Sequence, residues 1–250
     1  MFRIMVAAGL FVAASSALFS QTPEQRKKMI ETRPIMSSGE SGQRKARSMT
    51  RLKAEGVPVM NGLPVIENSN QAKKRTTEEI AKRAIAVCIT AIKGEGAGQA
   101  EISSLVRKYG ADKFFSPVEA AFVKNPKPSQ QDRTKFAWRY ECYWVLLWSL
   151  GYVDKLARPT DICNVKAAVG FLRSRDTARF IKDAKLRPIG AILDEADIIY
   201  RYHWAVTENG MKNKPAPAKL NGDVVQERHY VLNWLIGYSG QSWDDISTDT

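Results

Sequence analysis

The 250-residue sequence lacks the short motifs by which most classes of enzyme are identified. It contains no glycine-rich nucleotide loop, no HExxH zinc motif and no GxSxG nucleophile elbow. Its three cysteines and two histidines do not have the spacing of metal ligands, so a zinc finger is excluded. A catalytic role therefore has no support from a motif, and we expect neither a cofactor nor a resident metal.

Cysteine is too scarce for disulfides to be the main stabilising device of the fold. The number of cysteines is odd, and Cys88 and Cys142 lie in helical apolar patterns, where a free cysteine behaves as a small buried hydrophobe. One disulfide, between Cys142 and Cys163, remains possible because the chain turns back between these residues. The alternative is three free thiols.

The sequence also lacks an apolar run of the ~20 residues that a bilayer-spanning helix needs. Its first residues instead combine a short positive segment ending at Arg3 with an uncharged run over residues 4–18. Small residues suited to cleavage stand at Ser15, Ala17 and Ser20. This pattern predicts a cleaved signal peptide over residues 1–20, a periplasmic or extracellular location, and no transmembrane segment in the mature chain. An uncut membrane anchor is the alternative.

Positive charge is concentrated near the N-terminus. The net charge is +12, and residues 21–75 hold twelve Lys/Arg against five Asp/Glu, whereas residues 76–250 hold 25 against 21. Residues 21–42 combine this charge with Pro, Gly and Ser, which predicts a basic flexible linker. Such an arm is one candidate anion binder, but no aromatic side chains are interleaved for base stacking, so we do not expect a nucleic-acid partner.

The remaining residues, 43–250, predict a single all-α domain. No two alternating apolar runs are joined by a hairpin turn, and start signals such as Thr76 with Glu79 and Ser116 with Pro117 precede helical periodicity. The expected helices cover residues 43–55, 76–94, 99–109, from 116 onward, 129–151, 164–173, 176–185, 188–208 and 224–238.

The segment 129–151 is expected to form the centre of this bundle. Within residues 136–150 (FAWRYECYWVLLWSL), only Arg139, Glu141 and Ser149 are polar. A helix that is apolar on every side belongs in the interior of a domain. We therefore predict a helical bundle around this central buried helix.

Residues 56–68 (GVPVMNGLPVIEN) are expected to be an extended strap on the helical body. Pro58 and Pro64 exclude a helix interior, while the five aliphatic residues around them require burial.

The two histidines, His203 and His229, fall on the last two predicted long helices. Each lies in an apolar stripe, His203 with Ile199 and His229 with Leu232, which favours packed core histidines. The alternative is a metal-assisted or acid/base hydrolase, in which Glu195 or Glu227 would complete a two-His, one-carboxylate site.

Charged residues on the central helix and on the last two helices suggest a shared polar cluster. Arg139 and Glu141 are about 200° apart on a helix and cannot pair with each other. A buried charge needs a partner, so we expect Glu141 to meet Arg201, Arg228 or a histidine, and Arg139 to meet Glu227 or Asp197. The candidate cluster comprises Arg139, Glu141, Asp197, Arg201, His203, Glu227, Arg228 and His229.

One part of this cluster also has a simpler interpretation. Asp194, Asp197 and Arg201 fall at i, i+3 and i+7 on one helix face, which is typical of a solvated row of ion pairs.

Several long segments of the sequence resemble those of a known protein family. They are GVPVMNGLPVIE (56–67), RTTEEIAKRAI (75–85), SQQDRTKFAWRYECYWVLLWSLGYVD (129–154), KLRPIGAILDEADIIYRYHWA (185–205), ERHYVLNWLIGY (227–238) and WDDISTDT (243–250). Together they resemble the bacterial family known as domain of unknown function 4272, over residues 44–250. The resemblance implies a helical domain and no established activity.

Taken together, these patterns favour an exported helical module that acts by binding a protein or another component of the cell envelope. The hydrolase near His203 and His229 and the anion-binding arm are the alternatives, and the oligomeric state is left open.

Overall fold

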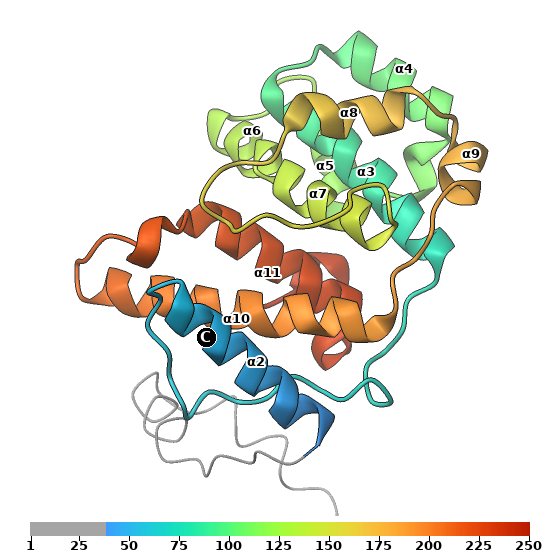
Figure 1. Ribbon diagram of the computed structural model, residues 1–250. Helices are drawn as coiled ribbons and strands as arrows, with labels where there is room; N and C mark the ends of the chain where they lie inside the picture. Colours follow the sequence, from blue (N-terminus) through green and yellow to red (C-terminus); the bar gives the residue numbers. More distant parts are fainter. Residues whose placement is uncertain (1–38) are drawn as a thin grey trace, which may run out of the picture. The chain divides into compact units, whose positions relative to one another are not determined.

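The computed structural model describes residues 39–250, which are helical and contain no strand (Figure 1). The predicted all-α fold class is confirmed for this part of the chain. The predicted signal peptide and nearly all of the predicted linker lie outside the described residues. Over the described range, no helix combines the length and apolar character needed to cross a membrane.

Of the described residues, 39–59 and 65–250 form one compact unit, and residues 60–64 are grouped separately. The α-helices are α2 (Glu40–Ala54), α3 (Thr77–Glu95), α4 (Gln99–Tyr109), α5 (Pro117–Lys124), α6 (Gln130–Ala137), α7 (Arg139–Ser149), α8 (Val165–Arg173), α9 (Thr177–Lys182), α10 (Ile189–Met211) and α11 (Gly222–Ile236). Short 3-10 turns are η1 (Ala111–Lys113), η2 (Pro217–Lys219), η3 (Tyr238–Gly240) and η4 (Trp243–Asp245).

The helix starts follow the local signals of the sequence. Thr76 and Glu79 form a capping box at the start of α3, and Ser116 and Glu119 form another at the start of α5. In each box the hydroxyl accepts from the third helical N–H while the glutamate accepts from the cap N–H. Gly110 ends α4 in the left-handed conformation, as expected for a glycine C-cap.

Two predicted loop boundaries are wrong because neighbouring groups extend the helices. Residues 40–42, expected in the linker, belong to α2, whose Ser41 N–H donates to Asn68 Oδ1 at 3.0 Å. The expected loop over 209–223 is shorter at both ends. There α10 continues to Met211, and α11 begins at Gly222 because Asn221 Oδ1 accepts from the N–H groups of Asp223 and Val224.

The predicted central helix 129–151 is divided at Trp138 into α6 and α7. The expected burial holds for α7, in which every residue from Glu141 to Ser149 except Trp144 is buried. Helix α3 is equally enclosed, because Ile80–Gly94 is buried except for Lys82. A Cβ on Gly94 would lie 2.5 Å from the backbone nitrogen of Ala137, so α3 and α6 approach more closely than a side chain allows.

The elements fall into two groups joined by α11. Helix α3 packs on α4 through α9, while α10 packs on both α2 and α11, and α11 also packs on α7 (Figure 1). At the two ends of the strap, residues 57–59 and 65–68 have no regular structure and bury Val57 and Ile66, as expected. The expected burial is wrong for Val65, which is 39% exposed. This arrangement places one face of α10 under α2 and another against α11.

Candidate functional site

The structure pairs Glu141 of α7 with Arg228 of α11, one of the partners that the sequence allows. Arg228 Nε lies 3.2 Å from Glu141 Oε2, and both side chains are buried. The other carboxylate oxygen accepts from the backbone N–H of Cys163, and Arg228 Nη1 donates to the carbonyl of Ala157 at 2.7 Å. A buried ion pair with these additional hydrogen bonds ties α7, α11 and the segment before α8 together.

Arg139 pairs with Glu227, again as the sequence allows. Arg139 Nη1 lies 3.0 Å from Glu227 Oε2, and its guanidinium lies 3.9 Å from the centre of the Tyr230 ring. The thiol of Cys142 donates to the same Glu227 oxygen at 3.0 Å. Arg139 is therefore held by charge, by an aromatic face and by the fixed position of its partner.

The disulfide that the sequence allows between Cys142 and Cys163 is not formed. Cys88, Cys142 and Cys163 are all free and buried. Cys142 Sγ is directed at Glu227, while Cys163 Sγ contacts the Tyr140 carbonyl at 3.6 Å. Burial raises the pKa of the Cys142 thiol well above its usual value, and the neighbouring Glu227 adds to this effect. A protonated, enclosed thiol is a poor nucleophile.

Asp197 and Arg201 do not form the solvated row that their spacing suggests. Arg201 Nε and Nη2 lie 2.9 and 2.7 Å from the two Asp197 oxygens, and both side chains are buried. The reason is that α2 packs on α10 and covers this face. Lys45 of α2 lies close enough that Arg201 helps to lower the pKa of Lys45, although burial of Lys45 is the larger cause of that shift. Only Asp194 of the predicted row remains exposed.

The two histidines meet across the interface of α10 and α11. His203 Nδ1 and His229 Nδ1 are 2.8 Å apart, so one of these nitrogens carries a hydrogen and the other accepts it. Burial lowers the pKa of His203 to about 4 and that of His229 to about 3, and His203 contributes to the shift of His229. The pair is the packed, hydrogen-bonded arrangement that the apolar stripes favour.

A metal site at the histidines lacks a third ligand within residues 39–250. No group of three or more His, Cys, Asp or Glu side chains in that range is placed to hold a metal ion. Neither Glu195 nor Glu227 therefore completes the two-His, one-carboxylate set. The eight residues of the predicted cluster instead form four pairs, which are Arg139–Glu227, Glu141–Arg228, Asp197–Arg201 and His203–His229.

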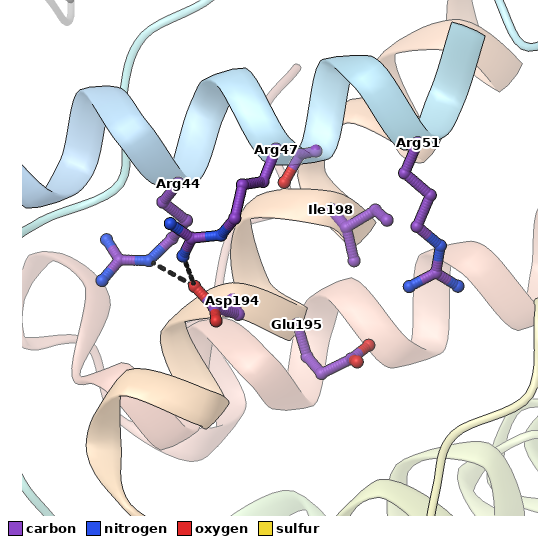
Figure 2. Close-up of a pocket in the computed structure, with 7 residues that line it drawn as sticks. Arg44, Arg47, Arg51, Asp194, Glu195 and Ile198 are labelled. Carbon is purple, nitrogen blue, oxygen red and sulfur yellow. Dashed lines mark hydrogen bonds and ion pairs between the residues drawn. The ribbon is translucent and has the colours of Figure 1, made fainter. Parts of the chain in front are cut away.

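A pocket that the sequence did not reveal lies between α2 and α10 (Figure 2). Its volume is about 120 Å³, and its lining residues are Arg44, Arg47, Ser48, Arg51, Asp194, Glu195 and Ile198. The signal available in the sequence was the spacing of the α2 arginines, since 44, 47 and 51 fall on one helix face. Nothing in the sequence showed that this face meets α10.

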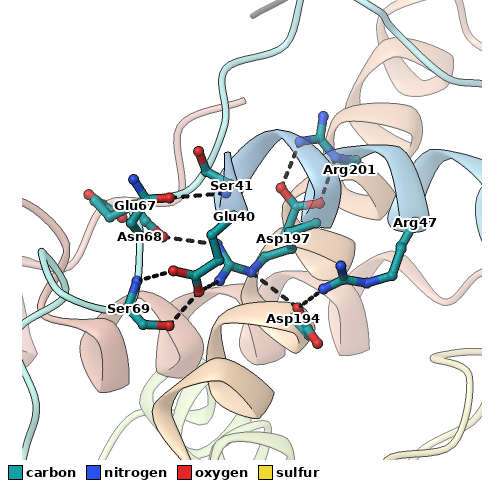
Figure 3. A network of polar contacts seen from close by, with 10 residues as sticks. Glu40, Ser41, Arg47, Glu67, Asn68, Ser69, Asp194, Asp197 and Arg201 are labelled. Carbon is teal, nitrogen blue, oxygen red and sulfur yellow. Dashed lines mark hydrogen bonds and ion pairs between the residues drawn. The ribbon is translucent and has the colours of Figure 1, made fainter. Parts of the chain in front are cut away.

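Arg44 forms the closed end of the pocket and has a structural role. Its side chain is 2% exposed, and its guanidinium donates to Asp194, to the Glu67 carbonyl and to Glu40. Glu40 in turn accepts from the backbone N–H of Ser69 at 2.9 Å (Figure 3). This network joins the start of α2 to α10 and to the chain that leads into α3.

Arg47 and Arg51 form the open side, and their side chains are 59% and 45% exposed. Arg47 Nη2 donates to Asp194 Oδ1 at 2.8 Å, and Arg51 Nε donates to Glu55 Oε1 at 2.9 Å. The other guanidinium N–H groups of both residues have no partner within the part of the chain that the structure describes. Two guanidinium groups one helical turn apart therefore present spare donors at the same pocket.

Comparison with known proteins places the chain in a family but supplies no activity. Searches of curated proteins and of solved structures return no match. Residues 44–246, which are most of the chain and include every residue of the pocket and of the four pairs, match one family profile. The chain therefore belongs to the family described as domain of unknown function (DUF4272).

Proposed function

We propose that this protein acts by binding, and that the pocket between α2 and α10 receives an anionic group of a protein or of another cell-envelope component. One observation carries the proposal. Arg47 and Arg51 line the same pocket, are about half exposed, and have guanidinium N–H groups with no partner in residues 39–250. Guanidinium groups are well suited to carboxylate and phosphate oxygens, because their planar donors match two oxygens at once.

The charge of the pocket lining and the fixed position of Arg44 support the same function. Three arginines face two carboxyl groups, so the lining has a positive excess. Arg44 is bound to protein oxygens on every side of its guanidinium, which fixes one wall and leaves Arg47 and Arg51 to move toward a ligand. The sequence suggested anion binding by the basic N-terminal arm; we now propose that the helix α2 binds the anion instead.

Replacing both Arg47 and Arg51 by alanine is expected to weaken anion binding about tenfold or more, since a charge-assisted hydrogen bond contributes roughly 1.5–3 kcal/mol. The measurement is a calorimetric titration of the full chain with inorganic phosphate at constant ionic strength. The double variant Arg107→Ala/Lys124→Ala is the matched control, because it removes the same two charges from exposed positions on α4 and α5. Equal affinities for the wild type and the double variant would contradict the proposal.

The location of the protein is part of the same proposal. The positive segment ending at Arg3 and the uncharged run over residues 4–18 support export with cleavage before Leu18 or Gln21. Mass spectrometry of the protein produced in its native host should give a new N-terminus at one of these residues. Soluble protein that retains Met1 would overturn the export proposal and leave the pocket unaffected.

A further inference from the structure

Glu195 lines the pocket, but its carboxyl group has no hydrogen-bond partner in the described part of the chain that would explain its position there. Its side chain is largely covered, it lies one residue after Asp194 on α10, and it borders the Arg51 end of the pocket (Figure 2). Unlike Asp194, which accepts from two arginines, the Glu195 carboxyl accepts no hydrogen bond from any residue in the described range. A largely covered carboxylate without a hydrogen-bond donor from residues 39–250 is free to accept one from a ligand in the pocket, with Arg51 as the first of the positive charges that act on it.

Charged groups from every neighbouring element act on Glu195. Burial is the largest effect and raises its pKa, and Asp194 on the same helix acts in the same direction. Arg51 of α2, Arg228 of α11 and Arg187 before α10 oppose this rise without cancelling it. The carboxyl therefore holds or accepts a proton more readily than an exposed glutamate does.

We propose that the pocket selects oxyanions that keep a proton at neutral pH, of which inorganic phosphate is the simplest, and that Glu195 determines this specificity. The inference rests on the proposed anion-binding function. The ligand's P–O–H group donates to the Glu195 carboxylate, while its other oxygens accept from Arg47 and Arg51. No proton has to be transferred, because the ligand brings the donor that Glu195 lacks.

Sulfate is rejected by the same arrangement. It has the tetrahedral shape of phosphate and carries no proton at neutral pH, so its oxygens would meet the carboxylate oxygens of Glu195. Two acceptors in contact repel each other, and sulfate can enter only when Glu195 is protonated. The pocket has room for such a ligand, because about 120 Å³ corresponds to roughly four water molecules at ~30 Å³ each.

The test compares inorganic phosphate with sodium sulfate on the full chain at constant ionic strength. The wild type at pH 7.5 is expected to bind phosphate at least about tenfold more tightly than sulfate, a difference of about 1.4 kcal/mol. In Glu195→Gln the amide can donate to either anion, so the ratio should fall close to one through tighter sulfate binding. Glu78→Gln, at an exposed position on α3, is the matched control and should keep the wild-type ratio.

A pH series gives a second measurement. As the pH is lowered from 7.5, wild-type affinity for sulfate should rise once Glu195 takes up a proton, which its raised pKa makes happen at a higher pH than for an exposed glutamate. The Glu195→Gln variant should show a flat profile. A wild type that binds both anions equally, or a Glu195→Gln variant with the wild-type ratio, would overturn the selection by Glu195. A wild type that binds neither anion would overturn the anion-binding function itself, so the two failures are distinguishable.

Discussion

Truncation of Glu141 to alanine is expected to lower the free energy of unfolding by about 3–5 kcal/mol, the cost of leaving a buried charge without its partner. Glu141 and Arg228 are 2% and 5% exposed, and their ion pair joins α7 to α11. Removing the carboxylate also removes the acceptor of the Cys163 N–H. Denaturant unfolding followed by circular dichroism measures the loss, provided that the dependence on denaturant concentration is unchanged.

Two controls separate a buried pair from a general effect of losing a glutamate. Glu101→Ala breaks an exposed pair with Arg173 and should cost less than about 1 kcal/mol. Adding Arg228→Met to Glu141→Ala should recover part of the loss, because the stranded charge is then absent. A loss below about 1 kcal/mol for Glu141→Ala would show that this pair does not hold the two helices together.

Acidification from pH 7 to about 4 is expected to destabilise the protein strongly through the two histidines. In the folded state their pKa values are lowered to about 4 and about 3, from an ordinary value of 6.5. The unfolded chain therefore binds more protons between these values, and stability falls as the pH falls. The full contribution is present above pH 6.5, and each histidine then costs roughly 1.4 kcal/mol per pH unit until its folded pKa is reached.

The measurement compares the pH dependence of unfolding in the wild type and in His203→Asn/His229→Asn. Between pH 6.5 and 4.5 the wild type should lose up to about 5 kcal/mol more than the variant, while the shared carboxylates cancel in the comparison. An NMR titration of the wild-type imidazoles gives an independent readout that does not need the variant to fold. Parallel unfolding profiles, or an imidazole that titrates near pH 6.5 in the folded protein, would be incompatible with a buried neutral pair.

Local signals in the sequence were sufficient for most helix starts. The capping boxes at Thr76 and Ser116 involve groups only three residues apart, so a short stretch of chain determines them. Three limits were less accurate. Helix α2 begins three residues early, where Ser41 meets Asn68, and α11 begins two residues early, at its Asn221 cap. Helix α10 continues three residues beyond its predicted end. Trp138 interrupts a helix that its apolar composition alone predicts to be continuous.

The candidate residues were predictable as a set, and their partners only in part. Burial of Arg139 and Glu141 requires opposite charges, which restricts the possible partners to a few residues of α10 and α11. That requirement does not choose between Arg201 and Arg228, or between Asp197 and Glu227. The choice depends on α11 lying against α7, while α10 turns Asp197 and Arg201 toward α2.

The sequence by itself determined the helical class, the capping signals, the burial of α7 and the need of its charged residues for partners. These properties follow from composition and from contacts within one or two helical turns. Only the tertiary structure decided that Asp197 and Arg201 are buried and that a pocket exists. Both depend on α2 meeting α10, for example through Arg44 and Asp194, which are 150 residues apart. Helix periodicity specifies which residues share a face, but it contains no information about which distant face will cover them.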